Sequence, residues 1–382
     1  MSDNIPFELQ QLIINKLPVE PLIRFRTVCK AWKSLIDSSD FIRNHITQQN
    51  QQHLLVRYHD ALHPELKYVS IADNDDDTDT FPKHKVFVTL PQLVVNMGNH
   101  YTTVDSSHGL FCLFSKTVFS KTDRKAVIWN PSIRKAVDVL LPDMADDEIE
   151  WYRTVLGFGV CRETKDPKIV QIKIDTDIDM EDAVPWQVEV FTLSTGVWRS
   201  AYSGNVPSKF VRFSTGEQVV VGGVVYWLAS GLASDRVDGG HGCDNLIVSF
   251  DLTSEEVGEV KLPGRLAHTH VTLSLFKLRE SLVVIEGGLE DYKLVYHVWR
   301  MEDGVPKLFE KLFTIGGHSP DGSMVSVRGF RMTGEALVDL RAHPGFVRTL
   351  AAYEPYSNSI KNLGISEIHI SVYSYTETLL LL

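Results

Sequence analysis

Residues 127–142 have the sequence Val-Ile-Trp-Asn-Pro-Ser-Ile-Arg-Lys-Ala-Val-Asp-Val-Leu-Leu-Pro. An apolar run is followed by a polar turn and then by a second apolar run. Apolar runs of this length, separated by Asn, Pro and Ser, are typical of β-strands joined by a turn. The stretch therefore predicts an antiparallel hairpin.

The same unit recurs along the chain. It begins at five positions, separated by 61, 59, 47 and 56 residues: Val127, Val188, Ile247, Leu294 and Leu350. Gly222-Gly223 lies between two valine-rich runs, which predicts a further tight hairpin whose turn needs positive φ. A period of roughly 50 residues with several strands is typical of a kelch-like propeller blade. We expect a mainly β protein in which residues 49–382 form an antiparallel, propeller-like domain of about six or seven blades. The alternative is an irregular pair of β-sandwiches.

The first 48 residues have a helical periodicity instead. Leu9, Leu12, Ile13 and Leu17 form one apolar stripe, and Pro18 predicts the end of that helix. Further helical patterns follow at residues 22–25, 28–36 and 41–46. The Gln-rich residues 48–52 mark the boundary, so we expect a helical domain at 1–48. A unit this small cannot bury all its stripes by itself. It is either a cap on the larger domain or a binding module for a partner.

The residues of this segment resemble the F-box motif. The resemblance rests on these strings: Ile5-Pro6-Phe7-Glu8-Leu9, Ile13-Ile14-Asn15-Lys16-Leu17-Pro18-Val19, Leu22-Ile23-Arg24-Phe25-Arg26, Val28-Cys29-Lys30-Ala31-Trp32 and Ser34-Leu35-Ile36. In that family the helices bind a Skp-type adaptor, which links the chain to the cullin and RING subunits of a ubiquitin ligase. The resemblance implies an adaptor-binding surface formed by Ile5, Pro6, Leu9, Ile13, Leu17, Pro18, Leu22, Val28 and Trp32, the last two at its edge.

The β region resembles the plant F-box-associated interaction domain. The strings that carry this likeness span most of residues 105–265: Gly109-Leu110-Phe111-Cys112-Leu113, Trp129-Asn130-Pro131-Ser132-Ile133-Arg134-Lys135, Gly157-Phe158-Gly159-Val160, Val190-Phe191-Thr192-Leu193, Trp198-Arg199, Gly222-Gly223, Tyr226-Trp227-Leu228, Ser249-Phe250-Asp251-Leu252 and Leu262-Pro263. The resemblance implies a domain that recruits a target protein, and a plant origin.

The composition argues against several other classes of protein. A net charge of -11 argues against nucleic-acid binding, which relies on clustered Lys and Arg. No apolar run approaches the ~20 residues of a membrane span. Neither a secretion signal nor a cysteine framework is visible, so we expect the cytoplasm and/or the nucleus. The tryptophans of the repeats, Trp129, Trp198 and Trp227, are expected to pack between sheets.

Residues that could bind a metal or act in catalysis occur, but without the spacing that such a site requires. Residues 239–244 bring His241, Cys243 and Asp244 together, but a metal site needs three or four converging ligands. The acidic residues at 73–79 and 175–182 lack the glycine and the glutamate of a calcium loop. No phosphate loop, nucleophile elbow or zinc-binding helix is present. We therefore expect no catalytic residue, cofactor or metal.

The sequence favours a non-catalytic substrate receptor of an SCF-type ubiquitin ligase, whose β-domain recruits an unidentified target. Target contacts are expected on long inserts of one face, at residues 73–83, 142–150, 175–185 and 232–245. Two other functions remain open. One is a propeller-type enzyme capped by the helices. The other is an F-box protein that works outside ubiquitination, as a scaffold or a carbohydrate-binding module.

Overall fold

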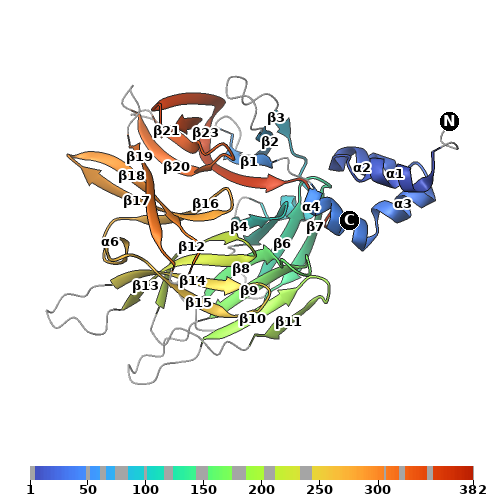
Figure 1. Cartoon of the computed structure of the whole chain (residues 1–382), viewed down its shortest axis with the longest axis horizontal. Helices are drawn as coiled ribbons and strands as arrows, with labels where there is room; N and C mark the ends of the chain where they lie inside the picture. Colours follow the sequence, from blue (N-terminus) through green and yellow to red (C-terminus); the bar gives the residue numbers. More distant parts are fainter. Residues whose placement is uncertain are drawn as a thin grey trace. The chain divides into compact units, whose positions relative to one another are not determined.

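The protein is described from a computed structural model, which covers residues 5–48, 52–60, 66–73, 85–98, 101–115, 124–142, 154–173, 186–201, 211–232, 243–304, 307–317, 323–341 and 347–381. Short helices precede a long series of antiparallel strands (Figure 1). This confirms the mainly β fold class. Within these ranges, no helix is long and apolar enough to cross a bilayer.

The chain forms two compact units. Unit 1 comprises residues 1–58, 65–141 and 373–382, and unit 2 comprises residues 59–64 and 142–372. The helical segment that the sequence sets apart at residues 1–48 thus shares a unit with β-strands. The sequence boundary at residue 48 follows a change of motif, whereas the two units follow packing. The two divisions of the chain differ for that reason.

Four helices open the chain: α1 (Phe7–Ile14), α2 (Val19–Phe25), α3 (Lys30–Ile36) and α4 (Ser39–Gln48). Pro6 and Pro18 are the residues directly before α1 and α2, in extended conformations that suit a helix start. Cys29 caps α3, because its Sγ accepts the backbone N–H of Trp32 at 3.4 Å. Val28 therefore precedes α3, although its spacing predicts a place inside that helix.

Unit 1 also contains two sheets. One has the order β4-β5-β6-β7, with the short helix α5 (Gln92–Asn96) before it; its strands are β4 (Tyr101–Ser107), β5 (Leu110–Ser115), β6 (Lys125–Asn130) and β7 (Lys135–Leu140). The other places the end of β23 (Ser359–Thr376) beside β1 (Gln52–His59), β2 (Leu66–Asp73) and β3 (Lys85–Phe87).

Unit 2 contains four sheets whose strands follow one another along the chain. The first two are β8 (Thr154–Val160), β9 (Pro167–Lys173), β10 (Gln187–Thr192) and β11 (Val197–Ser200), then β12 (Val211–Val221), β13 (Val224–Leu232), β14 (Cys243–Asp251) and β15 (Val257–Lys261). After α6 (Gly264–Ala267) come β16 (Leu273–Leu278), β17 (Ser281–Glu290), β18 (Lys293–Met301) and β19 (Phe309–Gly316). The last sheet has β20 (Met324–Phe330), β21 (Ala336–Arg341), β22 (Arg348–Glu354) and the first part of β23.

Strand β23 is 18 residues long and contributes to both units. It belongs to one seven-stranded sheet with the order β20-β21-β22-β23-β1-β2-β3. When β23 is counted once in each unit, the described strands form six four-stranded arrays. Repeated four-stranded sheets are the building unit of a propeller. The number agrees with the six or seven repeats expected from the period of the sequence.

Each of the five repeats found in the sequence forms a hairpin of two consecutive strands: β6–β7, β10–β11, β14–β15, β18–β19 and β22–β23. In the first, Asn130 pairs with Lys135 across the β6–β7 turn, and in the third Phe250 pairs with Val257 across the β14–β15 turn. The predicted hairpin at Gly222-Gly223 is confirmed: it joins β12 to β13, and both glycines have positive φ (59° and 81°). Only glycine adopts such angles at no steric cost.

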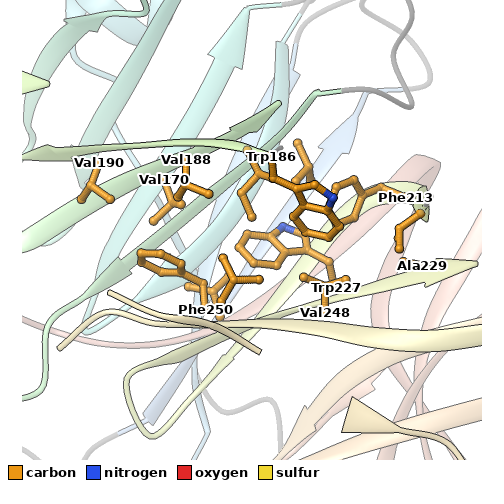
Figure 2. Close-up of a cluster of buried hydrophobic side chains, with 14 of the residues drawn as sticks. Val170, Trp186, Val188, Val190, Phe213, Trp227, Ala229, Val248 and Phe250 are labelled. Atoms are coloured by element: carbon orange, nitrogen blue, oxygen red, sulfur yellow. The ribbon is translucent and has the colours of Figure 1, made fainter. Parts of the chain in front are cut away.

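Aromatic and β-branched side chains form the core between the first two sheets of unit 2 (Figure 2). The fully buried Trp227 of β13 lies across from Trp186 and Phe213, and its indole N–H donates to the carbonyl of Leu156 at 3.2 Å. The packing expected for the tryptophans is seen for Trp227 and for Trp129, which is also fully buried. Trp198 is half-buried, against Phe191.

The packing of this core predicts that even one added methyl group on β8 lowers the stability of the fold. A Cβ at Gly157 would lie 2.3 Å from Cζ2 of Trp227, so Gly157→Ala overpacks the site. The free energy of unfolding, measured by urea titration, should fall by about 1–3 kcal/mol. Gly288→Ala on β17 is the control, since nothing lies within 4 Å of a Cβ there. Equal effects of the two substitutions would contradict this explanation.

Candidate partner-binding surface

The helices of residues 5–48 pack around a small apolar core in unit 1. Its fully buried members from the helices are Ile14, Val19, Leu22, Ile36 and Phe41. Each helix contributes at least one of them, so the core holds the bundle together. Burial of such a side chain contributes about 1.5–3 kcal/mol.

Trp32 connects three helices. Its indole N–H donates to Oε1 of Gln10 on α1 at 3.0 Å, and its ring lies 5.1 Å from that of Phe25 on α2. Arg26 and Asp37 add a two-point ion pair, in which Nη2 of Arg26 donates to Oδ2 of Asp37 at 2.9 Å. The hydrogen bonds from Arg26 hold the pKa of the Asp37 carboxyl below its ordinary value. The Trp32–Gln10 bond connects α3 to α1, and the Arg26–Asp37 pair connects the end of α2 to the end of α3.

Helix α1 carries a second apolar face that the core does not use. The only buried residue of α1 is Ile14. Leu9 and Ile13, spaced i and i+4, are 51% and 56% exposed, and Leu12 is 60% exposed. Ile5 and Phe7 extend the same exposed set. A contiguous group of large apolar side chains in water marks a surface for a partner.

The residues that the F-box resemblance implies for adaptor binding fall into three groups. Six are exposed: Ile5, Pro6, Leu9, Ile13, Pro18 and Val28. Leu17 and Trp32 are half-buried, at the edge of the core. Leu22 differs from the expectation, because its side chain is fully buried in the core of the helices. Phe7 and Leu12 belong to the exposed face as well; Leu12 has the i, i+3 spacing to Leu9 that the sequence already shows.

The two faces predict opposite effects of the same substitution. Leu9→Asp places a carboxylate in water, and the thermal stability of the chain should change by no more than about 0.5 kcal/mol. Leu22→Asp buries a charge without a partner and should cost about 4 kcal/mol or more. Thermal unfolding monitored by circular dichroism measures both. A strong loss of stability with Leu9→Asp would show that α1 is packed differently.

His45 makes the bundle sensitive to pH. It is fully buried, and its Nε2–H donates to the carbonyl oxygen of Leu17 at 2.9 Å. Burial lowers the pKa of His45, and the hydrogen bond to Leu17 opposes this only in part.

The unfolded chain takes up this proton from about pH 6.5 downwards, while the folded chain resists it. The free energy of unfolding should therefore fall as the pH drops below about 6.5, until the folded state is protonated too. His45→Gln should have a shallower decline between about pH 7 and pH 5 in chemical unfolding at several pH values. Identical slopes would rule out His45 as the source.

One ion cluster of the β region, formed around the buried Glu255, has a structural role. Lys168 of β9 and Arg199 of β11 both donate to Oε1 of Glu255, which lies in the turn after β14. Lys168 also donates to the carbonyl of Leu252 at 2.6 Å. Burial alone would raise the pKa of Glu255, but the hydrogen bonds from Arg199 and Lys168 outweigh it and lower the pKa. The cluster pins one sheet of unit 2 to the next, and its groups bind one another rather than a ligand.

Metal ligands do not converge in the parts of the chain that are described: they contain no group of three His, Cys, Asp or Glu side chains placed to hold an ion. Of the motif at 239–244, Cys243 and Asp244 start β14, and residues 239–242 lie outside the described ranges. Most of the four inserts expected to contact a target also lie outside these ranges; Asp73, Leu232 and residues 243–245 belong to strands.

Comparison with protein families matches two segments of the chain. Residues 2–44 match the F-box domain, and residues 78–332 match the F-box associated beta propeller domain. The second match covers more than half of the chain, so this chain belongs to the family of proteins with an F-box associated beta propeller domain. The helices and the repeated sheets described above are the two parts that this family combines.

Several proteins of Arabidopsis thaliana are similar to this chain. An F-box/kelch-repeat protein is 27% identical over 66% of this chain and 61% of its own length. F-box protein CPR1 is 27% identical, over 81% of this chain and 73% of its own. Another F-box protein is 25% identical, over 98% of this chain and 90% of its own length. The chain is a plant F-box protein. Among solved structures, an oligogalacturonate lyase in complex with manganese aligns with a TM-score of 0.40 and 12% identity, covering 82% of this chain and 74% of that one.

Proposed function

We propose that this F-box protein is the substrate receptor of an SCF-type ubiquitin ligase. In this function the helices bind a Skp-type adaptor, the adaptor connects them to cullin and RING subunits, and the β region binds the target protein. The proposal includes action in the cytoplasm and/or the nucleus. The observation that carries it is the exposed apolar face of α1, on a bundle whose inner apolar side chains are already buried.

The exposed face suits a protein partner in size and chemistry. Interface hot spots are large side chains that become fully desolvated at the centre of a contact. Leu9, Leu12 and Ile13 are more than half exposed and neighbour one another on α1. Their burial under a partner would add about 1.5–3 kcal/mol each. The half-buried Trp32 stiffens the edge of this surface through its bond to Gln10.

A receptor of this kind performs no bond chemistry itself. It raises the local concentration of the target beside the charged enzyme, and proximity alone can account for large rate increases. F-box proteins are generally non-catalytic adaptors for substrates. The charged groups of the buried cluster around Glu255 bind one another between two sheets. Both observations support a binding function.

The sheet β4–β7 suggests where the target binds. Its β4–β5 and β6–β7 turns share one end of the sheet, because the strands alternate in direction. Ile133, in the β6–β7 turn, packs against the helices. Strand β5 ends and β6 begins at the opposite end of the sheet. We place the target contacts at that end, where they do not compete with the helices.

Adaptor binding tests this proposal. A charge at Leu9 or Ile13 would have to be buried at the interface, so Leu9→Asp and Ile13→Asp should weaken binding of a purified Skp-type adaptor by at least about 30-fold. Isothermal titration or a surface-binding assay with the full chain measures the affinity.

The control is Val197→Asp on β11. Val197 is 59% exposed, like Leu9, but belongs to a sheet of unit 2. Its substitution should leave the affinity within about twofold of the unmodified chain. Undiminished binding by both α1 variants, or no binding by the unmodified chain, would refute the proposal.

A further inference from the structure

Residues 377–381 follow β23 and contact both the helices and the sheet β4–β7 of unit 1. We call these residues the strap. Thr378 and Leu379 are almost completely buried. A segment of five residues that loses this much exposed surface is held by specific contacts on each side.

On the sheet side, Asn130 holds the strap. Its Nδ2 donates to the carbonyl oxygens of Thr378 at 2.9 Å and of Leu380 at 2.7 Å. Its Oδ1 accepts the backbone N–H of Ser132 at 2.9 Å and shapes the β6–β7 turn. Asn130 is fully buried, so each of these bonds is shielded from water. One side chain thus builds the turn and binds the strap.

Gly109 provides the space in which the strap lies. It occupies the β4–β5 turn with a φ of 79°. A Cβ on this residue would lie 2.1 Å from the carbonyl oxygen of Thr376 and 2.7 Å from Cγ2 of Thr378. The two turns at this end of the sheet therefore both face the strap.

On the helix side, Leu379 completes the core of the bundle. Its side chain is fully buried in the same cluster as Ile14, Val19, Leu22 and Ile36. Ile133 from the β6–β7 turn joins that cluster at its margin. The helices therefore bury their inner apolar stripes partly against Leu379, which lies about 350 positions later in the chain.

Glu377 caps α2. Pro18, the residue before this helix, makes no side-chain cap. The Glu377 carboxylate instead accepts the backbone N–H of Val19, the first residue of the helix. Burial raises the pKa of Glu377, the bond from Val19 lowers it, and the nearby Glu20 carboxylate raises it further.

We propose that the strap locks the helical bundle onto the sheet β4–β7, so that the adaptor-binding face of α1 keeps one orientation relative to that sheet. The functional meaning of this lock rests on the proposed ligase function. A rigid receptor presents its target at a constant place relative to the adaptor, which lowers the entropy cost of bringing target and charged enzyme together.

Hydrogen exchange tests the lock in the full chain. Asn130→Asp keeps the acceptor that builds the turn but removes both donors to the strap. Leu379→Ser removes the side chain that fills the core. In both variants, amide exchange in α2, α4 and residues 377–381, followed by mass spectrometry, should accelerate about tenfold or more. Unchanged exchange in α2 and α4 in both variants would overturn the proposal.

Asp251→Asn is the matched control. Asp251 ends β14 as Asn130 ends β6, and its Oδ1 accepts the N–H groups of Thr253 and Ser254 at 2.7 and 3.1 Å. This substitution alters the same kind of turn at a place away from the strap. Amide hydrogen exchange in α2 and α4 should therefore stay as in the unmodified chain. An acceleration equal to that of Asn130→Asp would also overturn the lock.

The adaptor affinity of the unmodified chain separates the two proposals. If the adaptor does not bind, the ligase function fails, while the exchange data still decide the lock. If the adaptor binds and the strap variants exchange like the unmodified chain, only the lock fails.

Discussion

Four short helices with more apolar surface than they can enclose are the constraint on which this structure depends. Their inner stripes meet in one core, and Leu379, far away in the sequence, fills the space that remains. Leu9, Leu12 and Ile13 have no place in that core and stay in contact with water. Exposed apolar area is unfavourable by about 25 cal/mol per Å² compared with burial, so this face is the part of the bundle that gains most from a partner.

The β region solves a different problem, because long antiparallel arrays expose unpaired edges unless strands are arranged in repeated, mutually packed sheets. Consecutive sheets of unit 2 bury valine and aromatic faces against each other, as around Trp227. Strand β23 pairs with β22 and then continues into unit 1, where Tyr375 lies against His53 of β1 and bonds to Ser70 of β2. A strand that serves two sheets needs its partners from distant parts of the chain. Continuity of β23 thus brings the strap to the helices.

Local patterns predicted local structure well. The recurring hairpins, the Gly222-Gly223 turn and the start of α2 after Pro18 all depend on residues close in sequence, where strand alternation and turn stereochemistry act directly. Periodicity was less informative about the site. Leu9 and Leu22 both belong to apolar patterns, yet one is half exposed and the other fully buried. A helical stripe shows which side chains share a face, but not which of two apolar faces meets the core. For this reason the burial of Leu22 differs from the surface position that the resemblance implies. Val28 lies outside α3 because that helix begins only after the Cys29 cap.

By itself, the sequence determined the kinds of element, the repeat, the family and the residue set from which a partner surface is drawn, because these follow from the order and spacing of neighbouring side chains. Only the tertiary structure decided which apolar face stays exposed, that Asn130 holds a segment some 250 residues away, and that helices and sheet share one compact unit. Such contacts join positions that no local period connects. They exist because folding brings distant donors, acceptors and apolar groups together to replace their contacts with water.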